Sequence, residues 1–96
     1  MDQKTDEMRI TKTVTVVNPE GIHMRPADMF VRLANQFSSV VEVTKDGQTV
    51  DGKSILGILT LSANEGSQID IGASGDDAEL AIAALTHLVE VGFADN

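Results

Sequence analysis

The sequence contains no cysteine, and its 96 residues hold only two histidines. Without cysteine the chain can form no disulfide, no thiolate nucleophile and no cysteine-ligated zinc site. The two histidines, His23 and His87, lie far apart in the chain, so a metal site would need carboxylates gathered around one of them. We therefore expect no metal site and no bound cofactor.

Basic residues are scarce. Seven Lys and Arg face fifteen Asp and Glu, which gives a formal net charge of −8, and none of the seven lies beyond Lys53. This balance argues against non-specific nucleic-acid binding, because that binding needs cationic side chains to displace counterions from phosphates. The first ten residues are polar, without the apolar core of a signal peptide. We expect a cytoplasmic protein that binds neither nucleic acid nor a membrane.

The length suits one small domain. Residues 1–10 offer little to bury and predict a flexible leader, followed by a single domain at 11–96. Within it, the period of the apolar residues alternates between two and 3.6. The predicted elements are a strand at 11–17, a helix at 24–37, strands at 40–44 and 48–51 around an Asp46-Gly47 turn, a short helix after Ser54, a strand at 69–73, and a helix capped by Asp76 with Glu79. This β-α-β-β-α-β-α order favours an α+β fold whose largely antiparallel sheet has helices on one face.

One candidate site lies where the first predicted helix begins. His23 directly precedes that helix, Arg25 follows two residues later, and Pro26 fits only in a first turn. Free N–H groups at a helix start attract anions, and a guanidinium matches phosphate oxygens. A histidine here could carry a phosphoryl group, although spacing alone leaves open a surface histidine without a chemical role.

A second candidate site is Ser54, which precedes the short helix. A serine in this position is a good N-cap, and that role alone could explain it. A phosphate on Ser54 would also suit the positive end of the helix dipole, and it would add a dianion beside Ile55 and Leu56. Such a modification would change partner binding more than it would change the fold.

Residues 47–54, GQTVDGKS, also match the phosphate-loop pattern of nucleotide hydrolases. The context argues against that function, because Asp46-Gly47 predicts a tight hairpin that makes residues 48–51 a strand. The helix that follows is short, and no apolar strand leads to a magnesium-binding aspartate. We keep a nucleotide-binding protein as the least favoured hypothesis.

Two segments, GIHMRPA at residues 21–27 and KSILG at residues 53–57, together resemble the HPr family. These are the histidine-containing phosphocarrier proteins of the bacterial phosphoenolpyruvate-dependent sugar phosphotransferase system. The resemblance extends over about residues 12–92. It implies an open-faced sandwich, with a four-stranded antiparallel sheet in the order 1-4-2-3 and three helices on one face.

The resemblance also implies a phosphoryl carrier, which is a protein substrate rather than a turnover enzyme. Phosphorylated enzyme I would transfer its phosphoryl group to Nδ1 of His23, and Arg25 would stabilise that group. The carrier would then pass it to enzyme II (IIA) components during sugar uptake. We expect the carrier to be a monomer.

Two further roles follow from the same resemblance. Ser54 matches the serine that an HPr kinase/phosphorylase modifies, and Ile55, Leu56 and Leu59 match a surface on which partners dock. The alternative is a regulatory module for nitrogen or carbon control without sugar transport, which would act through Ser54 and the docking surface while His23 is idle.

Overall fold

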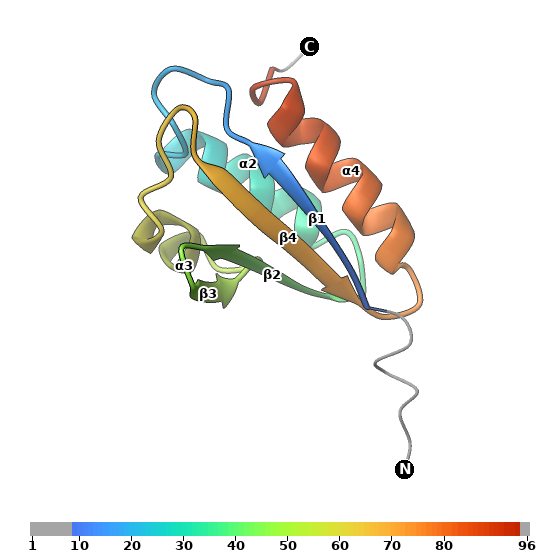
Figure 1. The fold of residues 1–96 in the computed structure, drawn as a ribbon. Coiled ribbons are helices and arrows are strands. Elements are labelled where there is room, and N and C mark those ends of the chain that lie inside the picture. The colour runs from blue at the N-terminus through green and yellow to red at the C-terminus, as the bar shows by residue number, and fades with distance from the viewer. Residues whose placement is uncertain (1–8, 95–96) are drawn as a thin grey trace.

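The computed structural model describes residues 9–94. Their elements follow the predicted β-α-β-β-α-β-α order (Figure 1). In chain order these are β1 (Arg9–Thr15), α2 (Met24–Ala34), β2 (Val40–Lys45), β3 (Gln48–Asp51), α3 (Ile55–Thr60), β4 (Gln68–Ser74) and α4 (Ala78–Glu90).

The four strands form one antiparallel sheet in the order β1-β4-β2-β3. In the view of Figure 1, α2 lies behind the sheet and α4 runs alongside β1, while α3 packs against α2 and β3. The α+β class, the sheet order and the three helices are therefore confirmed.

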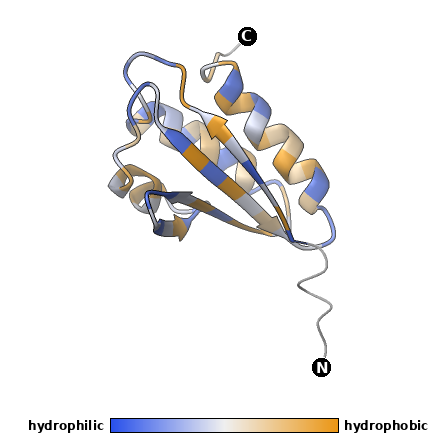
Figure 2. Cartoon of the chain, in the orientation of Figure 1, coloured by the Kyte–Doolittle hydropathy of each residue, from blue (hydrophilic) through white to orange (hydrophobic). Residues whose placement is uncertain are grey.

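Side chains along the strands alternate between the helix-covered face and the open face, which Figure 2 shows most clearly on β4. Ile69 and Ile71 point into the core and are almost fully buried, whereas Asp70 between them lies on the open face and accepts a hydrogen bond from Thr13. Phe30 of α2 and Leu85 of α4 fill the space beneath the sheet. Burial of these apolar side chains is the main stabilising contribution to the fold.

The first strand begins earlier than predicted. Arg9 pairs with Ser74 and Ile10 with the residue before it, so the predicted leader is wrong for these two residues. The rest of that leader, residues 1–8, lies outside the described part of the chain. Arg9 extends over Gly72, and its Nη1 lies 3.3 Å from Oε1 of Glu42, so one guanidinium spans three strands.

Two helix ends also differ from the prediction. Helix α2 ends at Ala34 rather than Phe37, because the amides of Gln36 and Phe37 donate to carbonyls only three residues earlier. The N-cap of α4 is Asp77 rather than Asp76, and its side chain does not cap the helix. Its carboxylate instead accepts hydrogen bonds from the backbone and hydroxyl groups of Ser38 and Ser39, which ties the start of α4 to the loop before β2.

The hairpin between β2 and β3 turns on Asp46 and Gly47, as predicted. Both residues have positive φ angles, 51° and 84°, as a two-residue turn that follows the twist of the strands requires.

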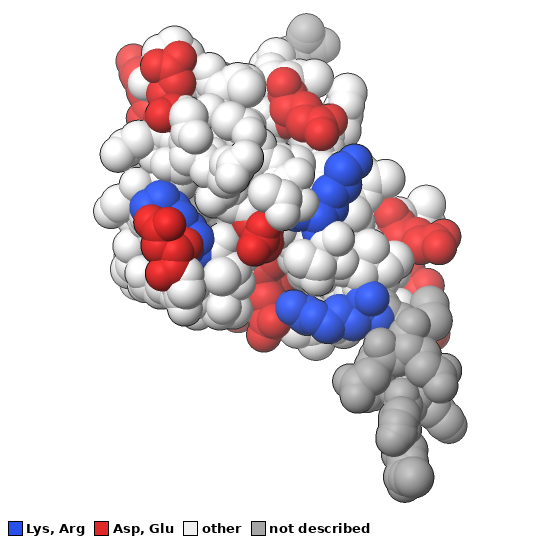
Figure 3. Space-filling view, viewed as in Figure 1, with Lys and Arg blue, Asp and Glu red and all other residues white. Residues whose placement is uncertain are grey.

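Figure 3 shows acidic side chains spread over the face of the molecule that is seen in Figure 1, with the basic groups few and separate. Between residues 9 and 94, none of the helices has the length and apolar character that crossing a membrane would need.

Candidate functional site

The loop that leads into α2 is held at several points. The N–H of Gly21 donates to the carbonyl of Asn18 at 3.0 Å, and the Asn18 side-chain amide donates back to the Gly21 carbonyl. Gly21 has a φ of 72°, and a β-carbon there would lie 2.5 Å from the carbonyl oxygen of Ala63. The next amide, of Ile22, donates to that same oxygen at 2.8 Å. These contacts fix the backbone directly before His23.

His23 is the N-cap of α2, and its carbonyl accepts the first helical hydrogen bond, from Ala27 at 2.9 Å. Its imidazole does not cap the helix. The ring stands half exposed, at 49% of its accessible surface, with Nε2 3.1 Å from Oε1 of Glu20. His23 therefore presents a reachable ring nitrogen at the positive end of a helix dipole.

Arg25 and His23 line the same open pocket of about 380 Å³. Arg25 is exposed, and within residues 9–94 no acidic group lies within ion-pair distance of it. Its guanidinium is thus available to an anion. Pro26 sits in the first turn, where its missing N–H costs no helical hydrogen bond.

The lining of this pocket also includes Phe93, from just beyond α4. The end of α4 is closed by two backbone bonds, from Phe93 to Leu88 at 2.9 Å and from Gly92 to Val89 at 3.0 Å. This closure brings the buried Phe93 ring to the pocket. The C-terminal end of the described chain and the start of α2 thus form one site.

Ser54 caps α3 as predicted, with its Oγ accepting from the N–H of Gly57 at 3.0 Å. Of the predicted docking residues, Leu56 is 74% exposed, whereas Ile55 and Leu59 are partly buried against the core. Met24, at the start of the neighbouring helix α2, is also exposed, at 59%. The short helix thus presents one large apolar side chain beside its cap.

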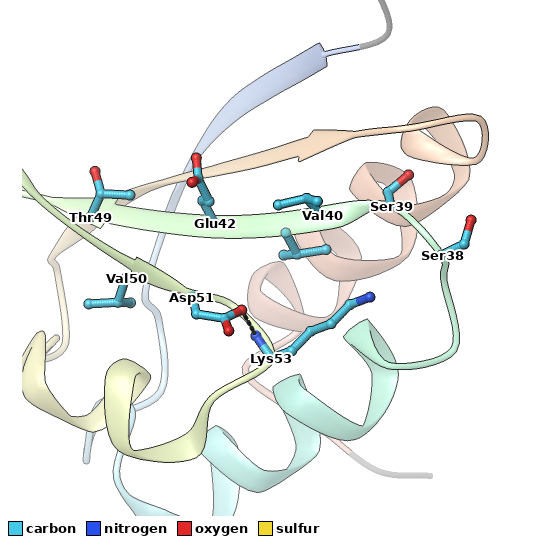
Figure 4. Close-up of a pocket in the computed structure, with 9 residues that line it drawn as sticks. Ser38, Ser39, Val40, Glu42, Thr49, Val50, Asp51 and Lys53 are labelled. Carbon is cyan, nitrogen blue, oxygen red and sulfur yellow. Dashed lines mark hydrogen bonds between the residues drawn. The ribbon is translucent and has the colours of Figure 1, made fainter. Parts of the chain in front are cut away.

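The phosphate-loop pattern takes no phosphate-loop conformation. Residues 48–51 form β3, paired with β2. Lys53 extends toward the end of α2 (Figure 4), where its Nζ donates to the carbonyl of Phe37 at 2.8 Å. Lys53 and Asp51 line a shallow pocket of about 400 Å³ against Ser38 and the start of β2. The lysine that would bind phosphate in a nucleotide hydrolase is occupied by a backbone carbonyl.

The fold and both motifs match one family of known proteins. The model of the family described as "PTS HPr component phosphorylation site" matches residues 10–91. The chain belongs to the HPr family. Curated relatives of this chain are named phosphocarrier protein HPr, and this chain has the strand and helix order of solved HPr structures.

Several HPr proteins are similar over most of their length. The HPr of Lysinibacillus sphaericus is 41% identical over 85 residues, which is 88% of this chain and 97% of that protein. The crystal structure of an HPr from Thermoanaerobacter tengcongensis has a TM-score of 0.86 at 41% identity, covering 91% of this chain and 98% of that one. An HPr-like protein named Crh, from Halalkalibacterium halodurans, is 38% identical over 81 residues, 84% of this chain and 96% of its own.

Sequence reasoning about the HPr motif singled out His23 and Arg25, and the structure brings both to one pocket. It missed two neighbours. Glu20 contacts the imidazole from the loop, a contact that its three-residue separation from His23 could have suggested. Phe93 reaches the pocket from the far end of the chain, and nothing in the local sequence indicates that approach.

Proposed function

We propose that this HPr-family chain accepts a phosphoryl group on Nδ1 of His23 from phosphorylated enzyme I. It then passes the group to enzyme II (IIA) components in sugar uptake, as a protein substrate rather than a turnover enzyme. The observation that carries the proposal is the half-exposed imidazole at the start of α2, which shares one pocket with the exposed side chain of Arg25; no acidic group within residues 9–94 pairs with that guanidinium.

The chemistry of the pocket suits a transferred phosphoryl group. The backbone N–H groups of Met24 and Arg25 lie in the first turn of α2, where they have no helical acceptor. These donors, the helix dipole and the Arg25 side chain all favour a dianion on the neighbouring imidazole. The open pocket lets a donor and an acceptor protein approach in turn.

Partner docking is proposed for Ile55, Leu56 and Leu59. Leu56 gives an exposed apolar anchor, and its two neighbours lie partly buried beside it. A small patch of this kind fits a transient complex that releases its partner quickly. We place this exchange in the cytoplasm, between a monomeric carrier and partners whose docking faces are less acidic than this chain.

A labelling experiment tests the transfer. The full chain is incubated with enzyme I and labelled phosphoenolpyruvate, and the acid stability of the product is measured. We expect acid-labile label in the native chain and none in His23→Ala. His87→Ala is the matched control and should retain full labelling. Label that persists in His23→Ala, or no acid-labile label at all, would contradict the proposal.

Ser54 supports a second proposed role, as the target of an ATP-dependent HPr kinase/phosphorylase. Its Oγ already faces the N–H of Gly57 at the cap of α3, so phosphate oxygens could take over that hydrogen bond. The dianion would lie beside Leu56, and like-charge repulsion would oppose docking of a phosphorylated partner. Similarity to Crh, an HPr-like protein, favours considering a regulatory output in nitrogen or carbon control without sugar transport.

The two roles separate by the stability of their products. Incubation with ATP and an HPr kinase should give acid-stable phosphate that disappears in Ser54→Ala and remains in the neighbouring Ser62→Ala. ATP-dependent phosphate without any label from enzyme I would favour the regulatory module over the carrier. Acid-stable label that persists in Ser54→Ala would exclude Ser54 as the target.

A further inference from the structure

The carboxylate of Glu20 lies against one nitrogen of the His23 ring, with Oε1 3.1 Å from Nε2. Both ends of this contact have defined backbones. The hydrogen bonds between Asn18 and Gly21 close the loop on either side of Glu20, and the bond from Ile22 to Ala63 holds the residue before His23. The loop therefore holds the backbones of Glu20 and His23 where their side chains can meet.

The chemistry of the two groups decides which ring nitrogen carries a proton. An ionised carboxylate can only accept hydrogen bonds, and a neutral imidazole has one N–H and one lone pair. The nitrogen that faces Glu20, Nε2, must then be the N–H. The lone pair is left on Nδ1, which caps no backbone N–H of α2.

We propose that Glu20 is a positioning residue that orients His23 and selects Nδ1 as its phosphoryl acceptor. The inference rests on the proposed function of His23. In the step itself, the Nδ1 lone pair forms a bond to phosphorus. The bond from phosphorus to the donor breaks, and its electron pair stays with the donor. The proton on Nε2 remains in place throughout.

The same contact assists the release of the phosphoryl group. Once phosphorus is bound to Nδ1, an Nε2 that keeps its proton leaves the ring positively charged, and Glu20 lies beside that charge. When the next nucleophile attacks phosphorus, the electrons of the N–P bond return to Nδ1 and the ring leaves as neutral imidazole. A neutral leaving group departs more readily than an anionic one. Glu20 thus favours the form of the carrier that is ready to transfer.

The size of the effect follows from the exposure of the pair. Glu20 is 79% exposed, so water and salt screen its interaction with the ring. Exposed charge pairs of this kind shift an equilibrium about two- to fivefold. We expect changes of that size, and we expect them to diminish at high ionic strength.

Two substitutions separate hydrogen bonding from charge. Glu20→Gln keeps an oxygen that can accept from Nε2 but has no charge, whereas Glu20→Ala removes both. Glu79→Gln is the matched control, because it removes one exposed carboxylate from the first turn of α4, at the other end of that helix from Phe93. His87 serves as an exposed imidazole within the same molecule.

The first measurement needs no phosphorylation. Ring ¹⁵N chemical shifts of the full chain, recorded where His23 is neutral, report how the proton is divided between the two nitrogens. We expect Nε2–H to dominate in the native chain, Glu20→Gln and Glu79→Gln. In Glu20→Ala the Nδ1–H population should rise about two- to fivefold, with His87 unchanged. An unchanged His23 proton distribution in Glu20→Ala would overturn the proposal.

The second measurement uses phosphoramidate, a small phosphoryl donor, so that enzyme I is not required. ³¹P NMR should show the label on Nδ1 of His23 in the native chain and a two- to fivefold larger share on Nε2 in Glu20→Ala. An identical site distribution in both proteins would overturn the role of Glu20. If these results hold while enzyme I fails to label His23, the proposed carrier function fails and the positioning of the ring stands.

Discussion

Arg25 lies in the first turn of α2 with a guanidinium that is free within the described chain, and its role is open to a graded test. We expect Arg25→Ala to lower the rate of phosphoryl transfer from enzyme I about 10- to 100-fold, because a charged donor to the phosphoryl oxygens is lost. The transfer rate of Arg25→Lys should lie between those of the native chain and Arg25→Ala, since an ammonium group keeps the charge but lacks the planar, forked guanidinium of arginine. Rapid-quench labelling measures both rates.

Arg32 provides the control for that prediction. It lies two turns further along α2 and pairs with Asp28 at 2.9 Å, so Arg32→Ala removes the same charge from the same helix. Its transfer rate should stay within about twofold of the native rate, as expected for an exposed i,i+4 pair. Equal losses in Arg25→Ala and Arg32→Ala would show a general effect of charge.

Within the described chain, the protonation state of Asp77 affects the stability of the fold. The hydroxyl of Ser39, then the backbone N–H of Ser38, are the largest causes that lower the pKa of this carboxyl below its ordinary 3.8. A carboxyl with a lowered folded pKa stabilises the protein above its unfolded pKa, and this contribution is lost as the pH falls through the folded value. Asp77 therefore stabilises the fold at neutral pH and ceases to do so in acid.

Thermal unfolding of the native chain and Asp77→Asn between pH 7 and pH 2 tests this coupling. We expect the native chain to melt at the higher temperature at pH 7. The difference should hold down to about pH 4 and shrink below 3.8. Asp76→Asn, which removes the exposed neighbouring carboxylate, is the matched control for the loss of one negative charge at this end of α4. A difference in melting temperature that stays constant down to pH 2 would show that the stabilisation does not come from the charge of Asp77.

At the scale of elements, different residues of α3 are expected to contribute to the stability of the fold and to partner docking. Ile58 is 2% exposed and belongs to the core, while Leu56 is 74% exposed on the same helix. Ile58→Ala should lower the free energy of unfolding by about 2–4 kcal/mol, and Leu56→Ala by less than about 0.5 kcal/mol. Urea denaturation measures both.

For partner binding, we expect Leu56→Ala to have a larger effect than Ile58→Ala. Leu56→Ala should weaken the affinity for enzyme I about tenfold in a calorimetric titration, because an exposed apolar anchor is truncated. Leu80→Ala is the control, because Leu80 is similarly exposed but lies on α4. Undiminished affinity in Leu56→Ala would remove α3 from the proposed docking surface.

Alanine substitutions at two glycines with positive φ test how closely two loops are packed. A β-carbon at Gly47, in the β2–β3 turn, meets nothing within 4 Å, so Gly47→Ala carries only the backbone cost, about 1 kcal/mol. Gly21→Ala should cost more, since its β-carbon would lie 2.5 Å from a carbonyl oxygen. We also expect slower phosphoryl transfer in Gly21→Ala alone, because His23 follows this loop. Equal stability losses in urea denaturation would contradict the close packing at Gly21.

The elements that sequence predicted well are those whose signals are local. The Asp46-Gly47 turn and the Ser54 cap depend on residues within a few positions, and both are confirmed. Asp77 was missed because its partners are Ser38 and Ser39, far away in the chain, and local spacing favoured a capping box at Asp76 instead. The sheet order followed from family resemblance, since no local pattern specifies which strands pair.

The site divides in the same way. His23 and Arg25 belong to one motif at the start of a helix, and a short motif can be found by inspection. Phe93 reaches their pocket through the fold of the whole chain. Its place depends on how α4 packs under the sheet, which is a property of the assembled core rather than of any segment.

At the scale of the whole molecule, the net charge of −8 bears on association. Like charges over the surface disfavour contact between two copies, so we expect a monomer in sedimentation velocity at neutral pH and moderate salt. Structures of HPr from Thermoanaerobacter tengcongensis and of Crh from Bacillus subtilis are dimers. The sedimentation experiment therefore tests whether this chain differs from those two proteins in its oligomeric state. A dimer that persists at micromolar concentration would contradict this expectation.

The strand order also sets when the molecule can be completed during synthesis. β4 lies between β1 and β2, yet it is the last strand to leave the ribosome. Until residue 74 has emerged, β1 has no neighbour in the sheet, and β2 has only its hairpin partner β3. Pairing over such long separations is slow, because loop closure must come before the contacts that reward it. The nascent chain therefore exposes unpaired strand edges until β4, which ends at Ser74, has left the ribosome.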